Sequence, residues 1–310
     1  MVADMSTRFK HAFVTGATGI VGSRLCERLS EIGIRVTAYS RTSSRHKQPE
    51  GVSQVYGDIR DTETLMTASH SVDVIFHLAG AVHNSCNTFE EYREVNVAGT
   101  ENVSELARTV GAKLIHVSTV NVEGFRSGEL KDYYANTKSQ AEDLIRDAVA
   151  GGLDAVIVRP GTVFGNSAGR SGMIVDRILN GSLNVLPAPS RMISPVWVDD
   201  LASALINAVD LGKKDHTYTV AGPAIKTSDF VKSICTLIGT SSPLISVPSW
   251  ALVLPIQLAW WGKRITHWVP PISVESIKHD SVYDGEKAAS DLRFIYTPLT
   301  DIFSDLNLES

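Results

Sequence analysis

Residues His11 to Gly22 read HAFVTGATGIVG, and the interpretation of the whole chain starts from this stretch. A short apolar run ends in a turn that carries Gly16, Gly19 and Gly22, and apolar residues at helical spacing follow at once. A strand, a glycine turn and a helix in this order form a phosphate cradle, because glycine permits the tight turn and the helix N-terminus offers unpaired N–H donors. The pattern predicts a dinucleotide site, although its spacing is not G-x-G-x-x-G, and a purely structural turn is the alternative.

The composition argues against several classes of protein. The 310 residues carry a net charge of −5, with acidic and basic residues interspersed, so no nucleic-acid partner is expected. The three cysteines, Cys26, Cys86 and Cys235, are far apart and lack C-x-x-C spacing. We expect reduced thiols in a cytoplasmic protein, with neither disulfides nor a metal site. The polar residues 1–10 lack the apolar core of a signal peptide.

Predicted strands and helices alternate through the first half of the chain. After the first strand we expect strands at 34–39, 54–56, 72–78, 113–118 and 155–158, and helices at 62–69, 89–110 and 133–150. The run at 72–78 is nearly all apolar, as is typical of a central parallel strand covered on both faces. The alternation predicts an α/β fold with a Rossmann-type doubly wound parallel sheet.

The alternation ends after Arg159 and Pro160, where glycines and prolines become frequent. Short, proline-broken elements are typical of a smaller lobe beside a sheet. We therefore expect a dinucleotide-binding Rossmann domain at 8–165 and a smaller C-terminal lobe at 166–310 that mainly binds substrate. Residues 193–222 are expected to return to the sheet, because 196–209 read as a short strand followed by a helix.

The residues after the second predicted strand bear on the choice of cofactor. An acidic side chain there usually accepts hydrogen bonds from the ribose hydroxyls of NAD. This chain has Ser40 and Arg41 instead, with further basic residues close behind. A cation attracts a 2′-phosphate, so we expect NADP(H) to be favoured, with NAD(H) as the alternative. A basic loop in solvent is the other interpretation of these residues.

The apolar stretch from Leu244 to Trp261 bears on membrane association. It contains three tryptophans, but Pro248 and Pro255 interrupt it and polar residues dilute it. A complete membrane span is therefore not expected. A helix that covers an apolar pocket or packs on the core is the simplest interpretation, and peripheral membrane contact is an alternative.

Tyr134 and Lys138 lie four residues apart in a predicted helix and therefore project from one face. Because a nearby cation favours a phenolate, we expect Lys138 to lower the pKa of Tyr134, which could then exchange a proton near neutral pH. Ser118 and Thr119 end the fifth predicted strand, where a doubly wound sheet places its ligand crevice. A surface pair is the structural alternative for Tyr134 and Lys138, but the preceding glycine cradle favours catalysis.

Several short motifs occur in one order along nearly the whole chain. They are VTGATGIVG at 14–22, GDIRD at 57–61, FHLAG at 76–80, VNVAGTEN at 95–102, VST at 117–119, YANTK at 134–138, RPGTVFG at 159–165 and VDDLA at 198–202. With these motifs the chain resembles the extended branch of the short-chain dehydrogenase/reductases. That branch includes sugar-nucleotide epimerases, dihydroflavonol-type reductases and 3β-hydroxysteroid dehydrogenases.

The resemblance implies roles for individual residues. Thr119 would hold the reacting oxygen, Tyr134 would exchange its proton, and Lys138 would tune Tyr134 and bind the nicotinamide ribose. Asn96 would be a supporting residue in its helix, where satisfying backbone groups is the simpler alternative. The resemblance further implies a set of cofactor-binding residues: Gly16, Thr18, Gly19, Ile20, Val21, Gly22, Ser40, Arg41, Asp58, Ile59, Leu78, Ala79, Gly80, Lys138, Pro160 and Val163.

We consider three functions. The first is an NAD(P)(H)-dependent oxidoreductase that moves a hydride between nicotinamide and a ketone or secondary alcohol on a fairly apolar small molecule. The second is an NDP-sugar epimerase or dehydratase with bound NAD. Such epimerases often carry an arginine where this chain has Ile193, with Arg191 two residues earlier, although Arg170 or Arg177 could substitute for it. The third is a non-catalytic dinucleotide sensor. By analogy with relatives, a homodimer would form through the helices at 89–110 and 133–150.

Overall fold

The computed structural model describes residues 9–43, 49–69, 71–82, 85–165, 175–178, 180–242, 245–266 and 279–304, with the backbone alone for 260–266 and 304. The chain divides into two compact units. Unit 1 comprises Met1–Pro160, Val198–Val220 and Gly285–Phe294, and unit 2 comprises Gly161–Trp197, Ala221–Asp284 and Ile295–Ser310. Three separate stretches of sequence therefore build each unit.

Unit 1 is built on one parallel sheet. Its strands are β1 (His11–Thr15), β2 (Arg35–Ser40), β3 (Val52–Tyr56), β4 (Val74–His77), β5 (Lys113–Val117), β6 (Ala155–Pro160) and β11 (Thr217–Val220). They lie in the order β11-β6-β5-β4-β1-β2-β3, and every neighbouring pair is parallel. The order reverses between β1 and β4, the position at which such sheets bind ligands. The predicted doubly wound sheet is confirmed, but the short strand β11 was not predicted.

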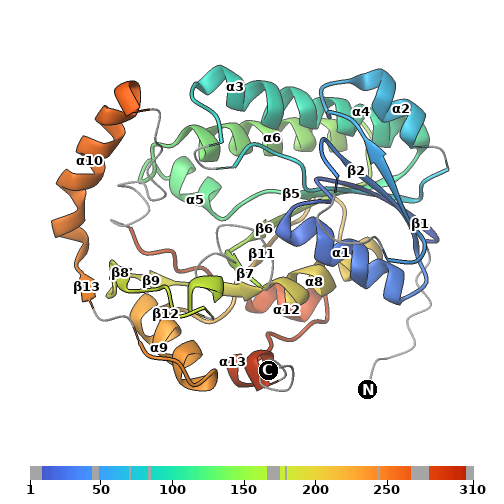
Figure 1. Ribbon diagram of the computed structural model, residues 1–310. Helices are drawn as coiled ribbons and strands as arrows, with labels where there is room; N and C mark the ends of the chain where they lie inside the picture. The colour runs from blue at the N-terminus through green and yellow to red at the C-terminus, as the bar shows by residue number, and fades with distance from the viewer. Residues whose placement is uncertain are drawn as a thin grey trace. The chain divides into compact units, whose positions relative to one another are not determined.

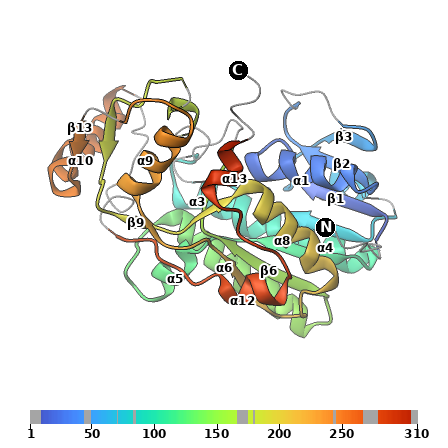
Figure 2. The same cartoon turned by 90° about the horizontal axis from the view of Figure 1, so that it is seen from below.

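Helices cover both faces of this sheet. α2 (Thr62–Ala68), α4 (Gly99–Val110) and α6 (Tyr133–Ala150) lie on one face, and α1 (Ile20–Glu31) and α8 (Val198–Asp210) lie on the other (Figure 1). α1 and α8 run beside each other beneath the sheet (Figure 2). Asp61 caps α2 by accepting hydrogen bonds from the amides of Glu63 and Thr64.

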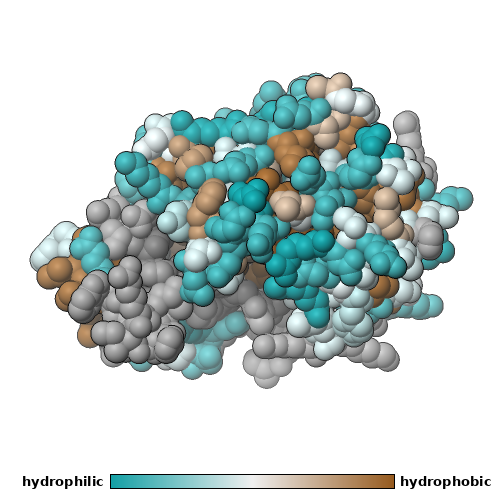
Figure 3. All heavy atoms as spheres, turned by 90° about the horizontal axis from the view of Figure 1, so that it is seen from above, coloured by the Kyte–Doolittle hydropathy of each residue, from teal (hydrophilic) through white to brown (hydrophobic). Residues whose placement is uncertain are grey.

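The outer surface over α2, α4 and α6 is largely hydrophilic, with separate apolar areas (Figure 3). Ion pairs run along it, including Arg108–Glu105 on α4 and Arg146–Asp143 on α6. Each helix therefore turns its apolar stripe to the sheet and its charges outward. The expected homodimer through α4 and α6 stays a prediction.

The predicted helix at 89–110 has the predicted bounds, but its middle is not α-helical. The structure has α3 (Phe89–Arg93), a π-helical turn η1 (Glu94–Ala98) and α4. A capping box of Thr88 and Glu91 starts α3. The wider turn brings Asn96 into the interior, where its amide binds backbone groups of Ala81. Such turns are frequent at functional sites, and hydrophobic periodicity does not reveal them.

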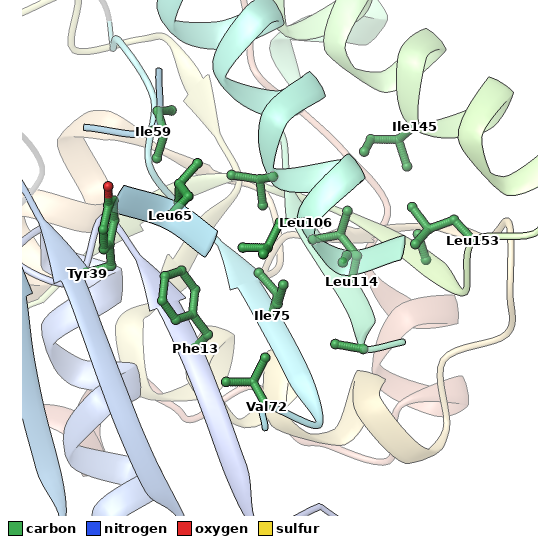
Figure 4. Close-up of a cluster of buried hydrophobic side chains, with 14 of the residues drawn as sticks. Phe13, Tyr39, Ile59, Leu65, Val72, Ile75, Leu106, Leu114, Ile145 and Leu153 are labelled. Carbon is green, nitrogen blue, oxygen red and sulfur yellow. The ribbon is translucent and has the colours of Figure 1, made fainter. Parts of the chain in front are cut away.

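The main apolar core of unit 1 lies between the sheet and the α4–α6 layer (Figure 4). Phe13, Ile75 and Leu114, from three adjacent strands, meet Leu106 of α4 and Ile145 of α6 there. Each of the five is at most 1% exposed. This core ends below the carboxyl ends of the strands, where the buried residues become polar.

Unit 2 is assembled from short elements. β7 (Thr162–Phe164) pairs with β10 (Pro195–Trp197), β8 (Val185–Pro187) with β13 (Ile245–Val247), and β9 (Met192–Ile193) with β12 (Ile225–Lys226). α9 (Thr227–Leu237) and α13 (Leu299–Ser304) complete its described core. Phe164, Phe230 and Phe303 belong to one buried cluster within this unit.

The apolar stretch from Leu244 to Trp261 contributes most of α10 (Ser249–Thr266), which runs through Pro255. Trp250, Leu254 and Leu258 are 80%, 64% and 60% exposed along it. Within the described residues, no helix has both the length and the apolar character needed to cross a bilayer. Peripheral membrane contact stays a prediction.

Leu114→Ala tests the position of the main core. Because Leu114 is fully buried in the sheet, we expect the free energy of unfolding to fall by roughly 2–5 kcal/mol. Met66→Ala is the control, since Met66 is 40% exposed on α2, and its cost should stay below about 0.5 kcal/mol. Urea denaturation measures both, and equal costs would contradict this description of the core.

Candidate active site

The glycine turn after β1 leaves room only for backbone. Gly16 has φ +68°, and a Cβ there would lie 2.7 Å from the Ala79 nitrogen. A Cβ on Gly22 would lie 2.2 Å from the Gly16 oxygen. α1 then begins at Ile20, with no side-chain cap from Gly19 and no acidic residue in its own first turn. These features fit the pyrophosphate of a dinucleotide.

The segment after β4 lies directly beside this turn. The amides of Leu78 and Ala79 both donate to Thr15 Oγ1 at 3.2 Å. A Cβ on Gly80 would approach the Asn96 Oδ1 to 3.0 Å. The structure thus brings Gly16, Ala79 and Gly80, three of the predicted cofactor residues, to one edge of the sheet.

Asp58 and Ile59 follow β3 at the same edge. The Asp58 carboxylate accepts bonds from Arg60 Nε at 2.9 Å and Arg60 Nη2 at 2.8 Å, and these bonds lower the pKa of Asp58. The Ile59 side chain would be only 2.5 Å from a Cβ on Gly99, so α4 packs closely against it. This pair forms a fixed carboxylate beside an apolar contact.

Ser40 and Arg41 differ in what they offer a ligand. Ser40 is buried, its hydroxyl donates to the Thr42 oxygen at 2.7 Å, and it accepts a bond from Gln54 Nε2 at 2.7 Å. Arg41 is exposed and helps to lower the pKa of Asp58. The side chain available at the end of β2 is therefore a cation, while Ser40 is engaged within the protein.

Tyr134, Lys138 and Thr119 come together where β5 ends and α6 begins. Asp132 caps α6 by accepting a bond from the Tyr134 amide at 3.1 Å. The Tyr134 phenol interacts with the Thr119 side chain. Lys138 is buried, and its Nζ donates to the Val117 oxygen at 2.7 Å. Burial lowers the pKa of Lys138 to about 8.

The prediction that Lys138 lowers the pKa of Tyr134 is wrong. Burial raises the pKa of Tyr134 to about 12, and the interaction with Thr119 only partly opposes the rise. The Lys138 ammonium is directed to the Val117 carbonyl instead of the phenol. Tyr134 is therefore a protonated phenol at neutral pH.

Asn96 joins the segment after β4 to α6. Its Oδ1 accepts a bond from the Ala81 amide at 2.7 Å, and its Nδ2 donates to the Ala81 oxygen and to Thr137 Oγ1, both at 3.0 Å. Thr137 Oγ1 in turn donates toward the Tyr133 and Tyr134 carbonyl oxygens. The backbone-satisfying role considered for Asn96 is thus present, and it acts between two parts of the site.

A buried carboxylate that the sequence motifs did not indicate lies one turn beyond Lys138. The Glu142 side chain is 0% exposed, and Arg159 binds both of its oxygens, at 2.7 and 2.6 Å. Arg146 adds a contact at 3.0 Å. Burial alone would raise the pKa of Glu142, but these guanidinium groups hold it below its usual range. The four-residue spacing from Lys138 was the available signal.

The remaining predicted residues divide between the units. Thr18 and Val21 lie in the turn and in the first turn of α1, and Pro160 ends β6, where its oxygen accepts a bond from the Val120 amide at 3.2 Å. Val163 lies in β7 of unit 2, where it pairs with Val196 of β10.

Comparison with known proteins identifies the family of this chain. A model of the NAD dependent epimerase/dehydratase family matches residues 12–221. The chain belongs to this family. It is an extended short-chain dehydrogenase/reductase of the NAD-dependent oxidoreductase and epimerase type, as its motifs indicate.

Two curated relatives are reductases of ketones. A 2-alkyl-3-oxoalkanoate reductase of Stenotrophomonas maltophilia is 30% identical over 207 residues, which cover 62% of each chain. A 4-hydroxy-2-methyl-3-oxo-4-farnesyl-3,4-dihydroquinoline-1-oxide ketoreductase of Stigmatella aurantiaca is 26% identical over 76% of this chain and 75% of that one. Against the first curated relatives, the match spans about three-fifths of their length.

The fold extends to solved epimerases. A UDP-glucose 4-epimerase of Thermotoga maritima superposes with a TM-score of 0.76 at 19% identity, over 96% of this chain and 97% of that one. At this identity the match establishes the fold alone.

Glu142→Gln tests the buried ion cluster. Removing the charge leaves the largely buried Arg159 with Glu123 as its remaining acidic partner, so we expect the free energy of unfolding to fall by roughly 3 kcal/mol near neutral pH. The pKa of folded Glu142 lies below the ordinary 4.5, so the carboxylate stabilises the protein above that pH and this stability is lost as the pH falls through the folded pKa. Asp143→Asn is the control, because Asp143 is 61% exposed and should cost less than about 1 kcal/mol. Denaturation as a function of pH measures both, and equal effects would contradict the burial argument.

Proposed function

We propose that this protein is an NADP(H)-preferring ketoreductase or alcohol dehydrogenase that acts on a fairly apolar ketone or secondary alcohol. The observation that carries the proposal is the assembly of Thr119, Tyr134 and Lys138 at the carboxyl end of β5, beside the glycine cradle of the same unit. A purely structural helix pair would not need a phenol paired with a hydroxyl and a buried ammonium one turn away.

In the direction of reduction, Thr119 donates a hydrogen bond to the substrate carbonyl oxygen and orients it. The reduced nicotinamide, when bound, supplies the hydride to the carbonyl carbon. Tyr134 donates its proton to the developing alkoxide, for which its raised pKa of about 12 keeps it protonated beforehand. The products are the alcohol, the oxidised cofactor and a phenolate that regains its proton from solvent.

Lys138 lies one turn from Tyr134 on α6, and its ammonium donates to the Val117 oxygen at the end of β5. We propose that this charge supports the phenolate that forms when Tyr134 gives up its proton. In the extended family this lysine would also bind the nicotinamide ribose. With a pKa of about 8, Lys138 is mostly charged at neutral pH.

Two observations favour an apolar ketone over a nucleotide sugar. The similar reductases named above act on an alkyl-substituted oxoalkanoate and on a farnesyl-bearing oxo compound. Ile193, at the position expected for the epimerase arginine, is 6% exposed in the apolar cluster of unit 2. Arg191 donates to the His279 oxygen and to Ser281 Oγ, and Arg170 lies outside the described residues. An NDP-sugar epimerase remains the second candidate, supported by the shared fold.

Tyr134→Phe tests the acid. Because the phenol oxygen is lost while the cradle is untouched, we expect kcat for ketone reduction to fall by roughly 10²- to 10⁴-fold with cofactor affinity unchanged. The control is Tyr133→Phe, which alters a neighbouring phenol that is 53% exposed. Steady-state kinetics and cofactor fluorescence titration measure the two effects. Retained activity with lost cofactor binding would refute the role.

Arg41→Ala tests the cofactor preference. Loss of a charge-assisted bond to the 2′-phosphate should weaken NADPH binding roughly 10- to 100-fold and leave NADH binding unchanged. Arg108→Ala, which removes another exposed arginine, is the control. Before titration, the purified protein is denatured and assayed for released dinucleotide. Released NAD, with no preference for NADPH, would favour the epimerase.

A further inference from the structure

A buried histidine at the end of β4 connects the cofactor cradle to the catalytic helix. His77 is 0% exposed, and both of its ring nitrogens are hydrogen-bonded. Nδ1 lies 2.8 Å from Thr15 Oγ1, and Nε2 lies 3.0 Å from Thr100 Oγ1. None of the mechanistic steps above uses this side chain.

The partners of His77 determine the direction of each hydrogen bond. Thr100 Oγ1 donates its hydrogen to the Asn96 carbonyl oxygen at 2.6 Å, so it can only accept from His77. Nε2 of His77 therefore carries the hydrogen and Nδ1 is an acceptor. Thr15 donates to that acceptor and accepts the amides of Leu78 and Ala79. The hydroxyls and ring nitrogens of Thr15, His77 and Thr100 all have hydrogen-bond partners only while the imidazole is neutral. Burial lowers the pKa of His77 to about 3, which favours the neutral form.

This row of hydrogen bonds ends at two places that matter for the site. At one end, Thr15 binds the Ala79 amide and directly precedes Gly16, and Gly16 and Ala79 together border the cradle. At the other, Thr100 binds the carbonyl of Asn96 within the π-helical turn. The Asn96 side chain then reaches Ala81 and, through Thr137, the start of α6.

We propose that His77 and Thr100 are positioning residues that set the spacing between the cofactor-lining segment 78–81 and the helix that carries Tyr134 and Lys138. Neither side chain needs to touch a ligand. They act through the backbone of Ala79 and the carbonyl of Asn96, which a buried chain of hydrogen bonds holds in one arrangement. Only the kinetic arm of the test below rests on the proposed function.

His116 provides a matched control within the same sheet. It is in register with His77 on the adjacent strand, its ring centroid is 5.3 Å from that of His77, and it too is 0% exposed. Among the described residues, neither of its ring nitrogens has a hydrogen-bond partner. Substituting His116 therefore removes a buried imidazole and leaves the hydrogen bonds of His77 intact.

Thr100→Val tests the proposal, because it keeps the side-chain shape and removes the hydroxyl. We expect amide hydrogen exchange in 78–82 of the cofactor-free protein to accelerate about tenfold and cofactor affinity to fall about tenfold. In the kinetic arm, kcat should fall while KM for the ketone changes little. Thr100→Ser restores the hydroxyl and should restore all three quantities, and His116→Leu should leave all three as in the unaltered protein.

His77→Asn is the second variant, since a shorter side chain keeps an acceptor near Thr15 without reaching Thr100. We expect His77→Asn to show the same faster exchange and weaker cofactor binding, so it provides the test if Thr100→Val does not fold. Unchanged exchange and affinity in the folded variants would overturn the proposal. So would a failure of Thr100→Ser to restore them, or the same changes in His116→Leu. Altered exchange and affinity without any reductase activity in the unaltered protein would instead count against the proposed function alone.

Discussion

A buried ammonium is the constraint on which the rest of the site depends. Removing a cation from water is costly unless other groups compensate for the lost hydration. Lys138 is 4% exposed, and its compensation comes from the Val117 carbonyl at 2.7 Å and from the Glu142 carboxylate one turn away. Because Val117 ends β5 and both charges lie on α6, these contacts tie the helix to the end of that strand. Thr119 and Tyr134 are brought together as a result.

The Glu142 carboxylate that compensates Lys138 is itself paired with neighbouring cations. Glu142 needs its own partners in the interior, and Arg159 of β6 and Arg146 of α6 supply them. Arg159 also contacts Glu123 of α5 (Asn121–Arg126), the helix that directly follows Thr119. A single buried charge therefore organises three elements around the end of β5. Stability and catalytic geometry rest here on the same contacts.

The polar chain through His77 follows a different principle from the ion cluster. Its members are neutral, and each hydroxyl or ring nitrogen has its hydrogen-bonding capacity filled by the next. A neutral, fully satisfied network is inexpensive to bury, and its bonds are directional. The apolar core around Phe13 and Leu114 can tolerate small shifts, whereas this network permits one arrangement of the backbone. The backbone is thus held most tightly at the edge of the sheet where the cofactor site is expected.

Local sequence patterns were enough to predict the sheet, the glycine turn and the placement of Tyr134 and Lys138 on one helix face, because strand and helix periodicities and fixed spacings are local properties. These patterns predicted α6 to the residue. The folded structure revealed the π-helical turn at Asn96, the strand β11 and the ion cluster at Glu142. It also reversed the expected shift of the Tyr134 pKa. Burial and long-range partners control these features, and neither is encoded in the spacing of residues along one segment.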